Sequence, residues 1–178
     1  MKKKFVRNKK TIVIRTATEK DAEVLLSWWN DGEIMAHAGF PLGLNTTIDK
    51  IKENIKKNCD TRELMLIEVD GLPVGELNYK IKDNIADFGI KICNKTFQNV
   101  GLGPIILNKL FKYLFEEKNV DKITCNTNLN NIRSQLVYEK KMQMKRTQTL
   151  YNSWINQIGE RCSVTFFEIT KKDFNSIN

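Results

Sequence analysis

The chain has 178 residues, of which 41% are hydrophobic and 28% are charged. This length fits one domain with a sizeable core, and the composition excludes a disordered, collagen-like or membrane-spanning chain. The formal net charge is +8, but six positive charges lie in residues 1–10, so the rest of the chain has a net charge of only +2.

Residues 1–10 hold lysine and arginine without an acid, and no apolar stretch follows them as it would in a signal peptide. We therefore expect a flexible basic arm at residues 1–10 and a single domain over residues 11–178. The four cysteines lie far apart, form no CxxC pair and are accompanied by a single histidine, His37. This pattern predicts free thiols in a reduced compartment, a cytoplasmic protein and no metal site.

The first predicted elements are a strand at 11–16, a helix at 18–30, a loop or broken helix at 31–45 and a helix at 46–59. Three strands follow at 63–69, 74–80 and 85–93, and Asp70-Gly71 is the hairpin turn between the first two. The remaining elements are a helix at 101–118, a strand at 122–127, a helix at 131–141 and strands at 143–151 and 163–170. This order predicts an α+β fold with a mixed, mostly antiparallel, seven-stranded sheet and about four helices. The strands on either side of the helix at 101–118 should be parallel.

The hexapeptide QNVGLG, residues 98–103, lies between a predicted strand and the longest helix. Its glycines let the backbone approach a ligand closely, and the N–H groups of the first helical turn attract an anion. Pro104 is tolerated there because its missing N–H breaks no helical bond. The segment therefore predicts a pyrophosphate cradle, with an ordinary loop-to-helix turn as the alternative. It is no Walker A loop, and the third glycine of a dinucleotide motif would fall at Ile106.

Two motifs resemble the GNAT family of acetyl-CoA-dependent N-acetyltransferases. QNVGLG matches the family's [QR]-x-x-G-x-[GA], and NIRSQLVYEK, residues 131–140, matches N-x-x-[AS]-x-x-x-Y-E-K. The N-x-R-S form is most like the branch of ribosomal-protein-alanine acetyltransferases and related small-amine acetyltransferases. The resemblance covers residues 11–170, although Met142-Gln143 stands where the family commonly has Gly-Phe.

The resemblance implies that acetyl-CoA is the acetyl donor and that no metal takes part. By position, the backbone of Lys91, Ile92 and Cys93 would pair with the pantetheine arm. The pyrophosphate would be wrapped by Gln98, Asn99, Val100, Gly101, Leu102, Gly103 and Pro104. Asn131 matches an asparagine that hydrogen-bonds the cofactor arm, with a helix N-cap as its other role. Arg133 would approach the phosphates, with a solvated charge as the alternative.

The resemblance also implies direct attack of an amine on the thioester. Tyr138 matches the family's tyrosine near the cofactor sulfur, where a phenol can protonate the leaving thiolate as a general acid. An ordinary core tyrosine is the alternative. Candidates for the general base are Glu76 and Asp87, either of which is otherwise a solvent-facing strand carboxylate. Trp29, His37, Phe40 and Tyr151 are candidates for the acceptor pocket.

The resemblance implies a primary amine as the acceptor, and three classes stay open: a protein N-terminus, an aminoglycoside or polyamine, and a small amino compound. The alternative function is a non-catalytic acyl-CoA sensor or a nucleic-acid-binding module on the same scaffold. With a body charge near +2 we do not expect nucleic acid as a partner, nor a membrane. Homodimers are common in such families, so a homodimer is open by analogy.

Overall fold

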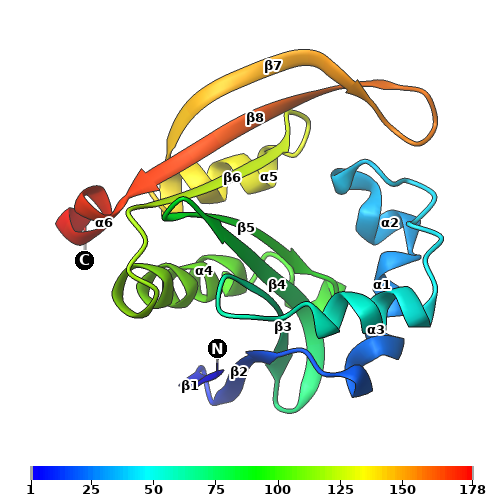
Figure 1. Cartoon of the computed structure of the whole chain (residues 1–178), viewed down its shortest axis with the longest axis horizontal. Helices are drawn as coiled ribbons and strands as arrows, with labels where there is room; N and C mark the ends of the chain where they lie inside the picture. Colours follow the sequence, from blue (N-terminus) through cyan, green and yellow to red (C-terminus); the bar gives the residue numbers. More distant parts are fainter. Residues whose placement is uncertain (1, 178) are drawn as a thin grey trace.

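One mixed sheet of eight strands organises the computed structural model, which describes residues 2–177 (Figure 1). The strands are β1 (Lys2–Arg7), β2 (Lys10–Thr16), β3 (Arg62–Val69), β4 (Leu72–Lys82), β5 (Ile85–Ile92), β6 (Lys122–Asn128), β7 (Lys145–Ile155) and β8 (Arg161–Thr170). Their order in the sheet is β1-β2-β3-β4-β5-β6-β8-β7, and neighbours are antiparallel except β5 and β6, which are parallel. The predicted α+β fold with a mostly antiparallel sheet is confirmed, with eight strands instead of seven.

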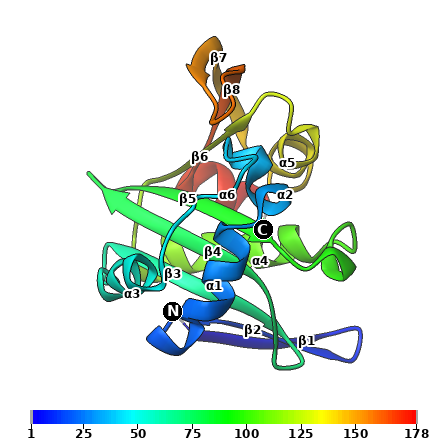
Figure 2. The ribbon, with the colours of Figure 1, turned by 90° about the vertical axis from the view of Figure 1, so that its right-hand side faces the viewer.

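The helices cover both faces of the sheet, with α4 on one face and α1 and α3 on the other (Figures 1 and 2). They are α1 (Ala22–Trp29), α2 (Gly32–Met35), α3 (Ile48–Lys56), α4 (Leu102–Lys112), α5 (Ile132–Leu136) and α6 (Lys171–Ile177). Two π-helical turns, η4 (Tyr113–Glu117) and η5 (Val137–Lys141), extend α4 and α5. The four predicted helices are present, α2 lies in the segment predicted as a loop or broken helix, and α6 is additional. No helix within residues 2–177 has both the length and the apolar character that a membrane crossing requires.

The first ten residues differ from the flexible arm that their charge suggested. Residues Lys2–Arg7 pair antiparallel with β2 through a turn in which Asn8 and Lys9 have φ of 48° and 64°. Positive φ at both turn residues matches the twist of a two-residue hairpin. The burial pattern alternates, with Lys3, Phe5 and Arg7 half-buried and their neighbours exposed. The segment is therefore an edge strand; the outermost predicted bounds, residues 1 and 178, lie outside the described part of the chain.

Two hydrophobic clusters fix the faces of the sheet. The larger joins one face of β2–β6 to α4 and η4, and its centre includes Ile106, Leu110 and Phe111, all fully buried. The smaller joins the opposite face of β3 to α1 and α3 through Leu25, Ile51 and other residues. The buried residues of each helix recur three or four positions apart, so that one apolar stripe of the helix faces the sheet.

The parallel pair β5–β6 separates after a short contact. The two strands are in register only over Ile85–Asp87 and Lys122–Thr124, and they diverge beyond those residues (Figure 1). On its other side β5 stays paired with β4 as far as Ile92. The edge of β5 that faces β6 is therefore free of ladder hydrogen bonds to β6 from Phe88 onward. The divergence is the feature that positions the site.

Candidate active site

The chain passes from β5 into α4 through a turn that exposes backbone N–H groups. Asn99 and Gly101 have φ of 60° and 75°, and Gly101 is the N-cap of α4. A Cβ on Gly103 would meet nothing within 4 Å apart from its chain neighbours and its own helix. The first turn of α4 thus has free N–H donors, the positive end of the helix dipole and room in front of Gly103. Only the backbone of Leu102 is available to a ligand, because its side chain is buried in the core.

Gln98 ties this turn to both neighbouring elements. Its Nε2 donates to the Ile92 carbonyl at 2.8 Å, and its Oε1 accepts from Arg133 Nη1 at 3.0 Å. Arg133 is thus hydrogen-bonded to the turn while its side chain stays exposed, so both the phosphate role and the solvated charge given as its alternative stay open. The structure brings together predicted cofactor residues from the end of β5, the turn and the start of α5.

Asn131 follows β6 at the same edge of the sheet, because the carboxyl ends of parallel strands point the same way. Its side chain accepts a hydrogen bond from the Ser134 N–H at 3.2 Å, so the N-cap role is observed. The end of β5 is held on its far side, where Val74 O accepts from the N–H groups of Cys93 and Asn94. A ligand that enters between β5 and β6 would meet Asn131 on one side and the β5 backbone on the other.

Tyr138 lies where the two strands separate. Its ring packs against Phe88, the first residue of β5 beyond the paired segment, with ring centroids 5.7 Å apart, and against Phe167 at 5.4 Å. Only 6% of the residue is exposed. Burial raises the pKa of Tyr138 above its ordinary value, and a hydrogen bond with Ser134 opposes part of that rise. The phenol therefore stays protonated at neutral pH, as a proton donor must.

Glu76 is a buried carboxylate with two partners, and it is not the solvent-facing group that its alternative described. Lys91 Nζ and Trp29 Nε1 each donate to it at 2.7 Å, and 2% of the residue is exposed. Lys91 is its cross-strand neighbour in the β4–β5 ladder. This cluster joins α1, β4 and β5 and fixes Trp29 on the face of the sheet opposite α4.

Asp87 occupies the last paired position of β5, opposite Thr124 of β6. The Thr124 hydroxyl donates to its carboxylate at 3.3 Å. The residue is exposed, yet neighbouring atoms crowd its carboxyl, and this loss of hydration raises the pKa of Asp87. Its charge also contributes to the raised pKa of Tyr138, so the two groups share one local field. Asp87 is a carboxylate without a lysine or arginine partner in the described ion pairs.

Three of the four candidates for the acceptor pocket are exposed, and they do not form one cluster among the described contacts. His37 lies exposed on the 3-10 turn η2 (Ala36–Ala38), Phe40 is 38% exposed, and Tyr151 projects from β7 with 74% exposure. No described contact joins Tyr151 to the other three candidates.

Trp154 of β7 and Gln157 beyond it hold the acceptor-side loop. Gln157, beyond the end of β7, donates to the Gly43 carbonyl at 2.9 Å and accepts from the Leu42 N–H at 3.0 Å. The Trp154 ring packs so closely on Gly39 that a Cβ there would stand 2.1 Å from it. The pairing of a tryptophan with a distant glycine is a weak signal in a single sequence.

The family assignment rests on the match of the chain to a described domain. A family model for an acetyltransferase (GNAT) domain matches residues 11–141. The chain belongs to the GNAT acetyltransferase family. This GNAT chain is an acyltransferase, as the resemblance of its two motifs predicted. No curated protein sequence matches it.

Solved structures share the fold of this GNAT acetyltransferase at low identity. Spermidine N-acetyltransferase from Vibrio cholerae, in complex with CoA and spermine, is 18% identical with a TM-score of 0.81 over 92% of this chain and 98% of that one. Ribosomal-protein-alanine N-acetyltransferase from Brucella melitensis is 18% identical with a TM-score of 0.75 over 88% and 98%. A ribosomal L7/L12 alpha-N-protein acetyltransferase in complex with CoA is 14% identical with a TM-score of 0.77 over 89% and 93%.

Proposed function

We propose that this GNAT acetyltransferase moves the acetyl group of acetyl-CoA to a primary amine in one direct step. The observation that carries the proposal is the divergence of β5 from β6 beside the open, glycine-containing start of α4. An unpaired strand edge can hydrogen-bond an amide-containing chain such as pantetheine. The helix start can bind a pyrophosphate. Two of the structural neighbours were solved with CoA, which supports the same donor here.

The donor would be held by the predicted residues in two groups. The backbone of Lys91, Ile92 and Cys93 and the side chain of Asn131 would hold the amide arm. The segment from Gln98 to Pro104 would hold the pyrophosphate, with Arg133 beside it. Bound there, acetyl-CoA supplies an activated thioester, and the site needs only to orient the amine and to move two protons.

Tyr138 is the proposed general acid. Its raised pKa keeps the proton on the phenol until the thiolate leaves, and transfer of that proton to sulfur prevents the reverse attack. The phenol lies beside Phe88 at the strand divergence, where a thioester held along β5 would end.

Asp87 is the better of the two candidate bases. The Glu76 carboxylate is buried and already accepts hydrogen bonds from Lys91 and Trp29, so it is not open to an incoming amine. Asp87 has a raised pKa and an exposed position at the edge of the divergence. It would take the proton that the amine must lose, directly or through water, while Glu76 holds Trp29 and Lys91 in place.

The test is an acceptor panel with acetyl-CoA and detection of the free thiol that is released. The panel holds N-terminal peptides, an aminoglycoside, a polyamine and small amino compounds, which are the three acceptor classes the sequence left open. Thiol release that depends on one amine class supports the proposal and names the acceptor. Tight CoA binding by calorimetry without release for any amine would favour the acyl-CoA sensor, and no CoA binding would refute the donor.

Four free cysteines also support a reduced compartment such as the cytoplasm.

A further inference from the structure

The strand β1 follows α4 from its end to its beginning. Its three half-buried side chains each contact a different level of the helix. The Lys3 ammonium pairs with Glu117, and Lys109 Nζ lies 5.4 Å from the centroid of the Phe5 ring. Arg7 Nη1 donates to the carbonyl of Gly101, the N-cap of α4, at 2.9 Å.

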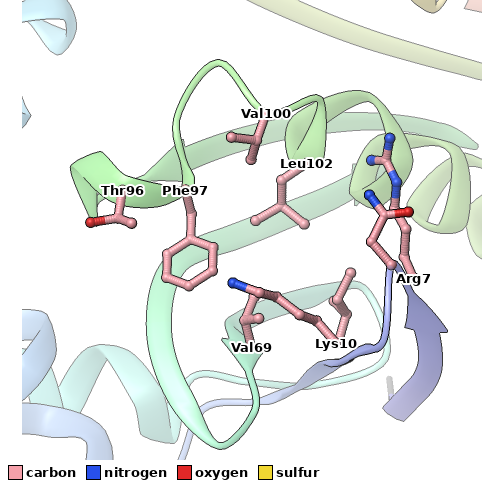
Figure 3. Close-up of a pocket in the computed structure, with 9 residues that line it drawn as sticks. Arg7, Lys10, Val69, Thr96, Phe97, Val100 and Leu102 are labelled. Atoms are coloured by element: carbon pink, nitrogen blue, oxygen red, sulfur yellow. The ribbon is translucent and has the colours of Figure 1, made fainter.

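A cavity of about 240 Å³ separates the β1–β2 hairpin from the turn that opens α4. Figure 3 shows Arg7 reaching from the hairpin toward the start of the helix, and the Lys10 ammonium beside the ring of Phe97. Lys10 Nζ lies 4.8 Å from that ring centroid. Arg7 and Lys10 thus each reach across the cavity from the hairpin to the turn.

The bond from Arg7 to Gly101 fixes more than one atom. The carbonyl of Gly101 and the N–H of Leu102 belong to one planar trans peptide unit and point in opposite directions. A donor that holds the carbonyl on the cavity side therefore aims the Leu102 N–H to the opposite side of the turn. The guanidinium charge also polarises this peptide, which makes its N–H a stronger donor. Gly101 has left-handed backbone geometry with few restraints of its own, so an external anchor matters there.

We propose that Arg7 is a positioning residue for the pyrophosphate-binding turn, and that the N-terminal hairpin is thereby part of the donor site. The inference rests on the proposed use of acetyl-CoA. Arg7 orients the first N–H of α4 without touching the donor, since it binds the carbonyl at the opposite edge of the same planar peptide unit. Lys4, on the exposed side of the same strand, carries an equal charge, and no side-chain hydrogen bond or ion pair joins it to α4 within residues 2–177.

The experiment compares three variants with the wild type: Arg7→Ala, Arg7→Lys and the matched control Lys4→Ala. In Arg7→Ala we expect the dissociation constant for CoA and the KM for acetyl-CoA to rise about tenfold with kcat within about twofold, because the Leu102 N–H is no longer held in the orientation that binds the pyrophosphate. Arg7→Lys should recover part of the loss because it keeps the charge without the planar fork. Melting temperatures should agree within about 3 °C across the set. Lys4→Ala should match the wild type throughout.

Hydrogen exchange on the free proteins makes the test independent of the donor. The peptide that covers residues 98–112 should exchange faster in Arg7→Ala than in Lys4→Ala, whether or not CoA binds, because it includes the hydrogen-bonded N–H groups of α4 beyond its first turn. Unchanged exchange there, or equal CoA affinity in the wild type and Arg7→Ala, would overturn the inference, as would an equal loss in Lys4→Ala. A wild type that does not bind CoA but shows faster exchange in Arg7→Ala would refute the proposed donor and leave the positioning contact established.

Discussion

The Glu76→Gln substitution separates a structural carboxylate from a catalytic one. Glutamine keeps the volume and one acceptor oxygen for Trp29, but it removes the charge that Lys91 faces at 2.7 Å. Breaking a fully buried ion pair costs about 3–5 kcal/mol, and losing one hydrogen bond to a charged group costs about 1.5–3 kcal/mol. The Lys91 side chain is 29% exposed and can turn toward water, so we expect a loss of about 2 kcal/mol in the free energy of unfolding.

Urea unfolding of Glu76→Gln, Lys91→Met and the double variant measures this value. The double variant should be more stable than the sum of the two losses implies, by about 1–2 kcal/mol, because no buried charge is left unpaired. In the acetyltransferase assay kcat of Glu76→Gln should fall less than about tenfold, since loss of a general base costs about 10²–10⁴. Unchanged stability with a kcat lowered a thousandfold would refute the reasoning and make Glu76 the base.

Three further predictions concern Gly103, Tyr138 and the cysteines. Gly103→Glu should abolish CoA binding as measured by calorimetry. Both Gly103→Glu and the control Gly103→Ala should fold, because open space surrounds this position. Normal affinity in Gly103→Glu would show that the helix start is not part of the donor site. Tyr138→Phe should lower kcat by about 10²–10⁴ with little change in KM for acetyl-CoA. Because burial raises its pKa, Tyr138 should cause no alkaline fall of kcat below about pH 10, and a fall that is lost in Tyr138→Phe would contradict this. A thiol reagent at pH 8 should label Cys59 early, because it is exposed and hydrogen bonds with Thr61 lower its pKa. Cys93 should react only on unfolding, because burial raises its pKa to about 12. Labelling in the reverse order would refute both shifts.

The sequence predicted the elements that depend on local pattern. Asp70-Gly71 forms the expected two-residue turn, with φ of 51° and 81°. The seven predicted strands and the parallel pair around α4 are confirmed. These features follow from period-two alternation, turn residues and helix caps, all of which are visible within about ten residues. The strand β1 was missed because the charge of its lysines masked the alternation of Lys3, Phe5 and Arg7.

The parts of the site that could not be predicted depend on contacts between distant elements. The pairing of Glu76 with Lys91 requires the register of β4 and β5, which the tight turn at Asp83 and Asn84 sets. The contact of Trp29 with Glu76 requires in addition the docking of α1 on the sheet. The anchoring of loop 39–43 by Trp154 and Gln157 joins residues more than a hundred positions apart. No pattern of spacing carries such information in one sequence.

The position of β1 gives the excess charge a further meaning. Every open sheet ends in strands whose outer N–H and C=O groups can template another chain, and β1 is one of the two ends here. Lys2 and Lys4 stand exposed on that strand. A second molecule that approached this edge would bring the same lysines with it, and the two rows of ammonium groups would repel each other. The exposed lysines of β1 thus disfavour growth of the sheet beyond its own chain.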